Sequence, residues 1–360
     1  MNPQRLLSHA CALAAALLVV SAASAGDDAR SLDGPTGDMG SEASGTTEGA
    51  TETEGEPALA AVAPDGPGAA TAEGSGQGGA KKHRTPPKPR RGGVNPCMTP
   101  DPGWGKYDKW KNVAIGQMVA PHKGGLTKSG GFDLLVHFHG HEPIRKEFIK
   151  SADGMVLVGI DLGIGSGAYQ NVFAAPTAWK NLVASVEATM SKKSGQKAHV
   201  RKIALSSWSA GYGAIEQILR QPAGNDIDAL VLLDSVHAGY IDEQKGTLKE
   251  DQLQPFVDFA RRAAKKERFM FLSHSSIQPP GYASTRETAA FIVGELNGKT
   301  RKATRLDVLG LDMFTRFDRG DFHVRGYTGD DKPDHCAHIG LMTSVLKVHL
   351  QPRFKTPRAR

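Results

Sequence analysis

The N-terminal part of the sequence lacks the residues that build a folded core. Between residues 26 and 93 there is no aromatic residue, and Gly, Ala, Thr, Ser, Glu and Pro dominate. A segment of this composition buries too little apolar surface to offset the entropy of ordering the chain. We therefore expect residues 26–94 to form a disordered, low-complexity linker that is stiffer near its prolines.

The N-terminus also lacks an apolar run long enough to span a bilayer comfortably. The run from Ala10 to Val20 follows Arg5 and precedes the small residues 23–25. This order is typical of a secretory signal peptide, so we expect residues 1–25 to be removed and the protein to be exported to the periplasm or the cell exterior. The alternative is an uncleaved anchor. After signal removal we expect no integral membrane span, although the linker could act as a tether.

Cysteine is scarce, with three in 360 residues. Cys11 lies in the expected signal peptide, which leaves Cys97 and Cys336. Because an exported protein meets an oxidising compartment, this even pair predicts a disulfide between the start of the globular part and the region before its last helix. The alternative is two independent buried thiols.

The formal net charge is +6, and part of it comes from the basic, proline-rich run at residues 81–91. Such a run can contact nucleic acid, but no nucleic-acid motif or interleaved aromatic residues accompany it, so a solvated linker is the favoured interpretation. We expect no nucleic-acid partner. The sequence indicates no organic cofactor and does not determine the oligomeric state.

Between about residues 95 and 355 the sequence alternates apolar strands with amphipathic helices. The expected strands lie within 111–119 and at 131–138, 154–160, 199–205, 227–233, 268–272 and 322–327. The expected helices lie at 178–190, 214–219, 253–266, 285–296 and 337–350. Near-continuous apolar strands between helices predict one α/β domain with a mostly parallel central sheet and helices on both faces.

Ser209 lies in the stretch Ser207-Trp208-Ser209-Ala210-Gly211, between an expected strand and an expected helix. A serine on a sharp strand-to-helix turn needs small neighbours, and its hydroxyl is pushed into the open. The pattern S-x-S-x-G is close to the G-x-S-x-G of a nucleophile elbow. The alternative is a Ser/Gly-rich loop without chemistry.

In a parallel sheet the site lies beyond the carboxyl ends of the strands. Polar side chains follow the expected strands at these ends: His139, Asp161, Ser209, Asp234, Ser273 and the region of His335. A nucleophilic serine needs a base and an orienting acid. His335 is the favoured base and His338 the second candidate. Asp234 is the candidate acid, although it could instead cap the following turn.

Three further predictions concern the oxyanion hole, the helix caps and the substrate pocket. The backbone N–H of Ala210 and one in the loop of His139 and Gly140 would form an oxyanion hole. Asp331 and Asp334 are interpreted as helix caps. The candidates to line an acyl or aromatic pocket are Tyr169, Phe173, Tyr212 and Tyr240.

The residues 136–140, the elbow at 207–211, Asp234 and the late histidine together resemble the α/β-hydrolase superfamily over about residues 130–350. The resemblance implies a Ser-His-Asp triad and acyl transfer, as in a secreted serine esterase acting on a small-molecule or polymer ester. The sequence departs from the family's pattern in two places: Ser207 replaces a glycine, and no carboxylate follows Leu272.

Two other functions compete with this one. His137, His139 and His141 could form a metal site, because His137 and His139 share one face of a strand. Further ligands would then come from Asp161, His237 or His274. The chain could also be a non-catalytic binding module on a hydrolase scaffold, since a fold does not guarantee an activity.

Overall fold

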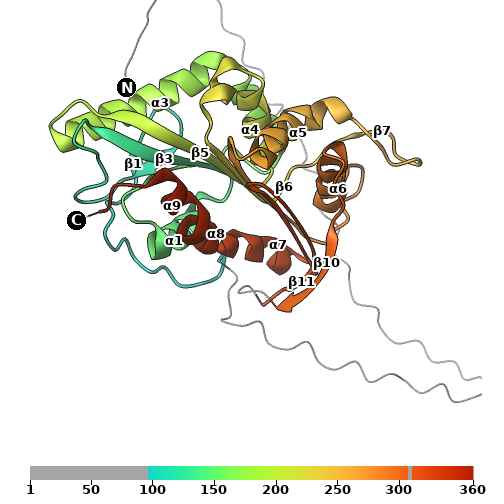
Figure 1. The fold of residues 1–360 in the computed structure, drawn as a ribbon. Helices are drawn as coiled ribbons and strands as arrows, with labels where there is room; N and C mark the ends of the chain where they lie inside the picture. The colour runs from blue at the N-terminus through green and yellow to red at the C-terminus, as the bar shows by residue number, and fades with distance from the viewer. Residues whose placement is uncertain (1–95, 307–309, 360) are drawn as a thin grey trace, which may run out of the picture. The chain divides into compact units, whose positions relative to one another are not determined.

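The computed structural model describes residues 96–306 and 310–359. The expected signal peptide and linker lie outside these residues. A single mixed sheet organises the described chain (Figure 1). From one edge to the other, its strands are β1 (Lys111–Asn112), β2 (Gln117–Val119), β4 (Val156–Ile160), β3 (Gly131–Phe138), β5 (His199–Ser209), β6 (Ala229–Ser235), β9 (Phe269–His274), β12 (Phe322–Tyr327), β11 (Asp312–Arg319) and β10 (Arg301–Leu306).

The central part of this sheet is parallel, as predicted. Every pairing from β4 through β3, β5, β6 and β9 to β12 is parallel, whereas β2 and β11 join its two edges antiparallel. All residues of β3 are buried. Strands buried on both faces read as near-continuous apolar runs, which is why they could be identified in the sequence.

Helices cover both faces of the sheet (Figure 1). One layer holds α2 (Ser166–Phe173), α3 (Pro176–Ser194), α4 (Tyr212–Leu219), α5 (Glu250–Ala264) and α6 (Thr285–Glu295). The other holds α1 (His141–Ser151), α7 (Lys332–Ala337), α8 (Leu341–Val345) and α9 (Gln351–Phe354). Each layer has its own apolar core against the sheet, so the predicted α/β architecture is confirmed.

Several elements differ from the sequence-based expectation. The helices α1 and α2 and the antiparallel strands β10 and β11 were not expected, and a small hairpin of β7 (Tyr240–Asp242) and β8 (Thr247–Leu248) also forms. The last helical segment begins at Lys332 rather than Ala337, because Asp331 caps it by accepting the N–H of Asp334. His335 therefore lies within α7.

A disulfide joins Cys97 to Cys336, whose Cα atoms are 6.2 Å apart. This is the disulfide that was predicted from the sequence. Cys336 belongs to α7 and directly follows His335. The bond therefore ties the N-terminal segment of the described chain to the helix that carries the candidate base. No helix among the described residues is long and apolar enough to cross a membrane.

Candidate active site

Ser209 lies at the end of β5, where the chain turns sharply into α4. Its φ is 50°, in the left-handed region that few residues other than glycine adopt. Gly211 completes the turn, since a Cβ there would lie 2.1 Å from the Phe138 carbonyl oxygen. Only glycine fits against that backbone. The strained serine and the crowded glycine are the features of a nucleophile elbow.

Ser207 occupies the position where the elbow pattern has glycine. Its side chain belongs to a chain of hydrogen bonds that holds the turn. Its hydroxyl is 2.7 Å from the Ser235 hydroxyl, and Ser235 donates to the Ser209 carbonyl oxygen at 2.8 Å. Both hydroxyls are fully buried. The serine therefore links β5 and β6 beneath the elbow, so this departure from the pattern keeps the turn in place.

Asp234 and His335 are paired. His335 Nδ1 is 2.7 Å from Asp234 Oδ2. The other oxygen, Oδ1, accepts the Ser275 N–H at 2.7 Å and the Thr285 hydroxyl at 2.6 Å. A carboxylate accepts only, so Nδ1 carries the proton and Nε2 is left as a base. Asp234 thus orients the imidazole from a buried, hydrogen-bonded position.

The carboxyl group of Asp234 stays ionised. Burial acts to raise its pKa, but nearby His338, the hydrogen bond and charge of His335, and the Thr285 hydroxyl together hold the pKa well below its usual value. The φ of Asp234 is 45°, a second strained backbone position at this edge of the sheet. Its side chain bonds to His335 rather than capping the following turn.

His338 takes a different place from His335. It is fully buried and its Nδ1 is 2.9 Å from the Ser273 hydroxyl. Burial lowers its pKa to about 4, so the ring is neutral near pH 7. Ser273 occupies the strand end where a carboxylate is missing, and it also accepts the Asp234 N–H. Of the two candidate histidines, His335 contacts the Asp234 carboxylate and His338 contacts the Ser273 hydroxyl.

The expected oxyanion donors are only partly available. No described residue accepts the N–H of Ala210. The His139 N–H, in contrast, donates to the Ile160 carbonyl at 2.8 Å, and the Gly140 N–H to Asp161 Oδ1 at 2.6 Å. The prediction that His139 or Gly140 offers a free N–H is therefore not met in this conformation.

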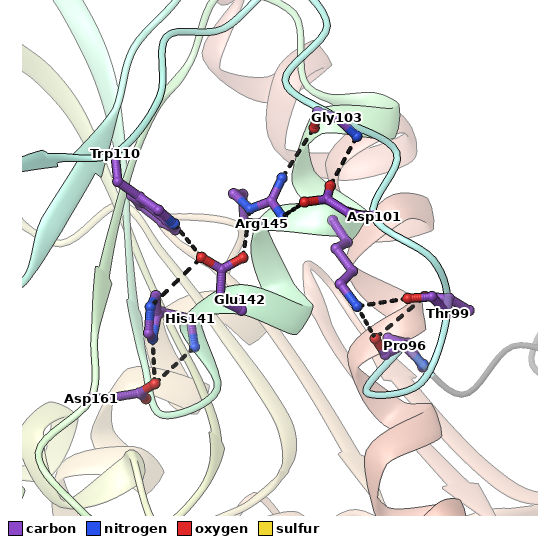
Figure 2. A network of polar contacts seen from close by, with 10 residues as sticks. Pro96, Thr99, Asp101, Gly103, Trp110, His141, Glu142, Arg145 and Asp161 are labelled. Atoms are coloured by element: carbon purple, nitrogen blue, oxygen red, sulfur yellow. Dashed lines mark hydrogen bonds and ion pairs between the residues drawn. The ribbon is translucent and has the colours of Figure 1, made fainter.

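Asp161 serves as a cap for α1 from the neighbouring strand. It accepts the backbone N–H groups of Gly140 and His141 and also pairs with the His141 imidazole. A negative charge at a helix N-terminus is favourable. Figure 2 shows how the contacts continue: Glu142 accepts the Trp110 indole N–H at 2.5 Å and Arg145 Nε at 2.8 Å.

Arg145 extends this network to the N-terminal segment. Its guanidinium is 2.7 Å from Asp101 and also donates to the Gly103 carbonyl oxygen (Figure 2). The side chain is only 2% exposed and stacks over the Trp104 ring. The network fastens residues 101–110 to α1.

The histidines of the candidate metal cluster do not converge. His137 Nδ1 pairs with the Ser206 hydroxyl, and its Nε2 donates to the His139 carbonyl oxygen. His139 pairs with the Tyr169 hydroxyl, and His141 with Asp161. Across 96–306 and 310–359, no group of three or more His, Cys, Asp or Glu side chains could hold a metal ion. His137 is a satisfied core histidine.

A cleft in two lobes opens at Ser209. One lobe has a volume of about 280 Å³, and its lining includes Ser209, Asp234, His335, Ile277 and Lys332. The other has a volume of about 450 Å³ and is lined by Ser209 and Ala210. His237 and Tyr282 border both lobes. The candidate nucleophile thus borders both lobes, the candidate base borders the smaller one and the candidate oxyanion donor borders the larger one.

The aromatic residues expected to line a pocket divide into two groups. Tyr212 lines the larger lobe. Tyr169 and Phe173 are fully buried in the core, and the Tyr240 hydroxyl bonds to Glu287 at 2.9 Å. The sequence alone does not separate core aromatic residues from those that line a pocket.

Sequence reasoning missed the residues that support the pair of Asp234 and His335. Thr285 and Ser275 come from segments far along the chain, and their hydrogen bonds follow from the tertiary fold. Trp208 was visible inside the elbow motif, but nothing in the sequence shows that it bonds to His335. For His237 the sequence suggests only the role of a metal ligand.

Comparisons with known proteins give structural matches only. No family model and no curated protein matches the sequence. Est1E from Butyrivibrio proteoclasticus matches with 11% identity over 68% of this chain and 96% of its own, at a TM-score of 0.32. The siderophore hydrolase EstB from Aspergillus nidulans matches with 13% identity over 69% and 96%, at a TM-score of 0.36.

A third match is LpqC, a poly(3-hydroxybutyrate) depolymerase from Bordetella parapertussis, with 15% identity over 64% of this chain and 84% of its own, at a TM-score of 0.37. These values are too low to transfer an activity. The fold class rests on the sheet topology of this chain itself, which has the α/β-hydrolase-like architecture.

Proposed function

We propose that the protein is a serine hydrolase that cleaves carboxylic esters with Ser209, His335 and Asp234. The observation that carries the proposal is the pairing of His335 Nδ1 with the buried Asp234 carboxylate, in a cleft that also contains Ser209. The three residues follow the chain order Ser, Asp, His that is typical of hydrolases with this elbow.

The chemistry would proceed through an acyl-enzyme. The Ser209 hydroxyl oxygen attacks the ester carbonyl carbon while His335 Nε2 takes its proton. The Ala210 N–H donates to the oxygen on which negative charge develops. The protonated imidazole then gives its proton to the departing alkoxide. Water repeats the sequence on the acyl-enzyme, which releases the acid and restores Ser209.

Asp234 contributes by holding the imidazole in the reactive tautomer. It also stabilises the positive charge that His335 acquires in the transition state. Its pKa lies well below the usual value, so it remains an anion near neutral pH.

Covalent labelling with a fluorophosphonate tests this proposal. The probe should label wild-type protein and leave Ser209→Ala unlabelled, and EDTA should change nothing. Ser129→Ala is a matched control, because Ser129 lies in an exposed turn and should label like wild type. Absence of labelling in folded protein would exclude the serine mechanism and favour a non-catalytic binding module.

We also propose that the protein is exported after removal of residues 1–25. The disulfide between Cys97 and Cys336 supports an oxidising destination. Expression of the full chain with its leader, followed by N-terminal sequencing of the exported protein, tests this. A mature N-terminus near Gly26 is expected, whereas retention of Met1 would contradict it.

A further inference from the structure

The end of β6 and the start of the loop after it have an unusual backbone. Asp234 has a φ of 45° and Val236 a φ of 90°. Positive φ is a genuine outlier for a β-branched residue such as valine. Strain of this kind persists only where the surrounding structure enforces it, and it gathers at functional sites. Here the Val236 carbonyl oxygen accepts the Thr288 hydroxyl at 2.8 Å, and the side chain is fully buried.

The residue that follows this strained loop is His237, and its ring is held in one tautomer. Its Nδ1 is 2.9 Å from the Ala283 carbonyl oxygen. Because a carbonyl oxygen only accepts, Nδ1 carries the proton and Nε2 has the lone pair. Burial lowers the pKa of His237, which keeps the ring neutral near pH 7.

The ring of His237 is also fixed in position. Tyr212 lies 5.7 Å from it and Tyr282 lies 5.0 Å from it, measured between ring centroids. His237 borders both lobes of the cleft together with Ser209. No described residue pairs with its Nε2. The structure therefore presents one oriented, uncharged hydrogen-bond acceptor at the junction of the two lobes.

His237 does not act as the base. Its Nδ1 bonds to a carbonyl group, whereas the Nδ1 of His335 bonds to the Asp234 carboxylate that would stabilise an imidazolium. An acceptor without a basic role is suited to recognition. An acceptor in a substrate cleft selects a ligand that brings a donor, because a substrate without one covers the nitrogen and leaves it unpaired.

We propose that His237 is a specificity-determining residue whose Nε2 accepts a hydrogen bond from a hydroxyl or amide N–H close to the scissile carbonyl. The preferred substrates are then esters whose acyl group carries such a donor, rather than plain alkanoyl esters. This inference rests on the proposed serine-hydrolase function.

Two pairs of p-nitrophenyl esters test the effect of the hydrogen-bond donor, because the two esters of each pair differ only in whether the acyl group carries one. The N-acetylglycine and 4-oxopentanoate esters differ only in N–H against CH₂. The 3-hydroxybutanoate and 3-methylbutanoate esters differ only in OH against CH₃. For each pair, the ratio of kcat/KM values is compared between wild type and variants, which cancels the intrinsic reactivity of the esters.

The informative variants are His237→Phe, which keeps a ring between the tyrosines but has no acceptor, and His237→Gln, whose amide oxygen can replace Nε2. In His237→Phe the preference for the donor ester should fall about tenfold, as expected for one hydrogen bond of ordinary strength. The ester without the donor should change little. His237→Gln should keep part of the preference.

The outcomes separate the two proposals. Suppose that fluorophosphonate labels Ser209. If wild type then shows no preference for the donor esters, or if His237→Phe loses activity equally on both esters of a pair, the role of His237 is wrong and the hydrolase function stands. If the wild-type protein neither labels nor turns over any ester, the hydrolase function fails and this inference fails with it. Circular dichroism of each variant checks its folding. If His237→Phe does not fold, the result for His237→Gln decides between the outcomes.

Discussion

The indole N–H of Trp208 donates a hydrogen bond to the backbone carbonyl oxygen of His335 at 2.9 Å. The two rings also pack together, with centroids 4.7 Å apart. The indole also stacks on the His139 ring, with centroids 5.2 Å apart. Trp208 directly precedes Ser209, so the residue next to the candidate nucleophile also positions the candidate base.

Trp208→Phe should therefore slow the reaction without weakening substrate binding. The variant keeps a ring against His335 but loses the hydrogen bond that fixes the histidine backbone. We expect kcat to fall about tenfold with little change in KM, since a small misplacement of a reacting group affects the transition state most. Steady-state kinetics on an ester that the wild type cleaves measure this.

The matched control is Trp179→Phe in α3, where a buried tryptophan packs in the core. It should lower the melting temperature but leave kcat unchanged. An equal loss of kcat in both variants would mean that Trp208 acts only through global stability.

Asp234→Asn tests the orienting acid. Asparagine keeps the shape but offers an N–H as well as an oxygen to His335, which favours the unreactive tautomer. A loss of kcat of about 10⁴-fold is expected, the size found when a triad aspartate is replaced in this way. Asp228→Asn, which changes the same residue type just before β6, should leave kcat unchanged. Retention of most activity in Asp234→Asn would remove Asp234 from the mechanism.

The sequence predicts the fold well because its central strands are buried on both faces. A short apolar sequence such as that of β3 is typical of a buried core strand. Ser209 and Asp234 could be chosen as candidates for a related reason: parallel topology brings the ends of β5 and β6 to the same edge.

The parts that the sequence does not predict depend on contacts between distant residues. The occupied N–H groups of His139 and Gly140 result from Ile160 and Asp161 on the neighbouring strand. The choice between His335 and His338 depends on where α7 begins, and the structure starts it five residues before the periodic pattern at Ala337 suggests. Local patterns contain neither piece of information.

Loss of the disulfide should affect both stability and activity. Cys97→Ser/Cys336→Ser removes a bond across a sequence separation of 239 residues. In the chain-entropy view such a long-range bond is worth about 3–5 kcal/mol of unfolding free energy. Because Cys336 adjoins His335, we also expect a reduced kcat below the melting temperature. Urea unfolding and kinetics of the double variant, beside reduced wild type, measure both effects.

A structural disulfide with no connection to the site would give a different result. The double variant would then lose stability while kcat at low temperature stayed at the wild-type value. Cys97→Ser alone would leave Cys336 as a free thiol next to the base, so the double variant is the cleaner test.

The pair of His141 and Asp161 should make stability depend on pH. The hydrogen bond and charge of Asp161 raise the pKa of His141 despite its burial. Burial opposes the shift of Asp161, but His141 and the N–H groups of Gly140 and His141 lower its pKa to about 2. The unfolded values are about 6.5 and 3.9.

The sign of each contribution follows from these directions. His141 binds its proton more tightly in the folded state, so its contribution is complete below about pH 6.5 and is lost as the pH rises through the raised folded pKa. Asp161 contributes above about pH 4 and loses its contribution as the pH falls toward 2. The pair therefore stabilises most between about pH 4 and 6.5, by less than about 1 kcal/mol because both side chains are partly exposed and screened by water.

Urea unfolding of wild type and His141→Gln between pH 4 and pH 9 measures this contribution. The difference in unfolding free energy should be largest near pH 5 and shrink toward pH 9, as His141 loses its charge. Adding Asp161→Asn to His141→Gln should remove little more near pH 5, because asparagine can still accept the Gly140 N–H. A difference that is constant or grows up to pH 9 would show that His141 stabilises α1 by packing against Trp110 rather than by its charge.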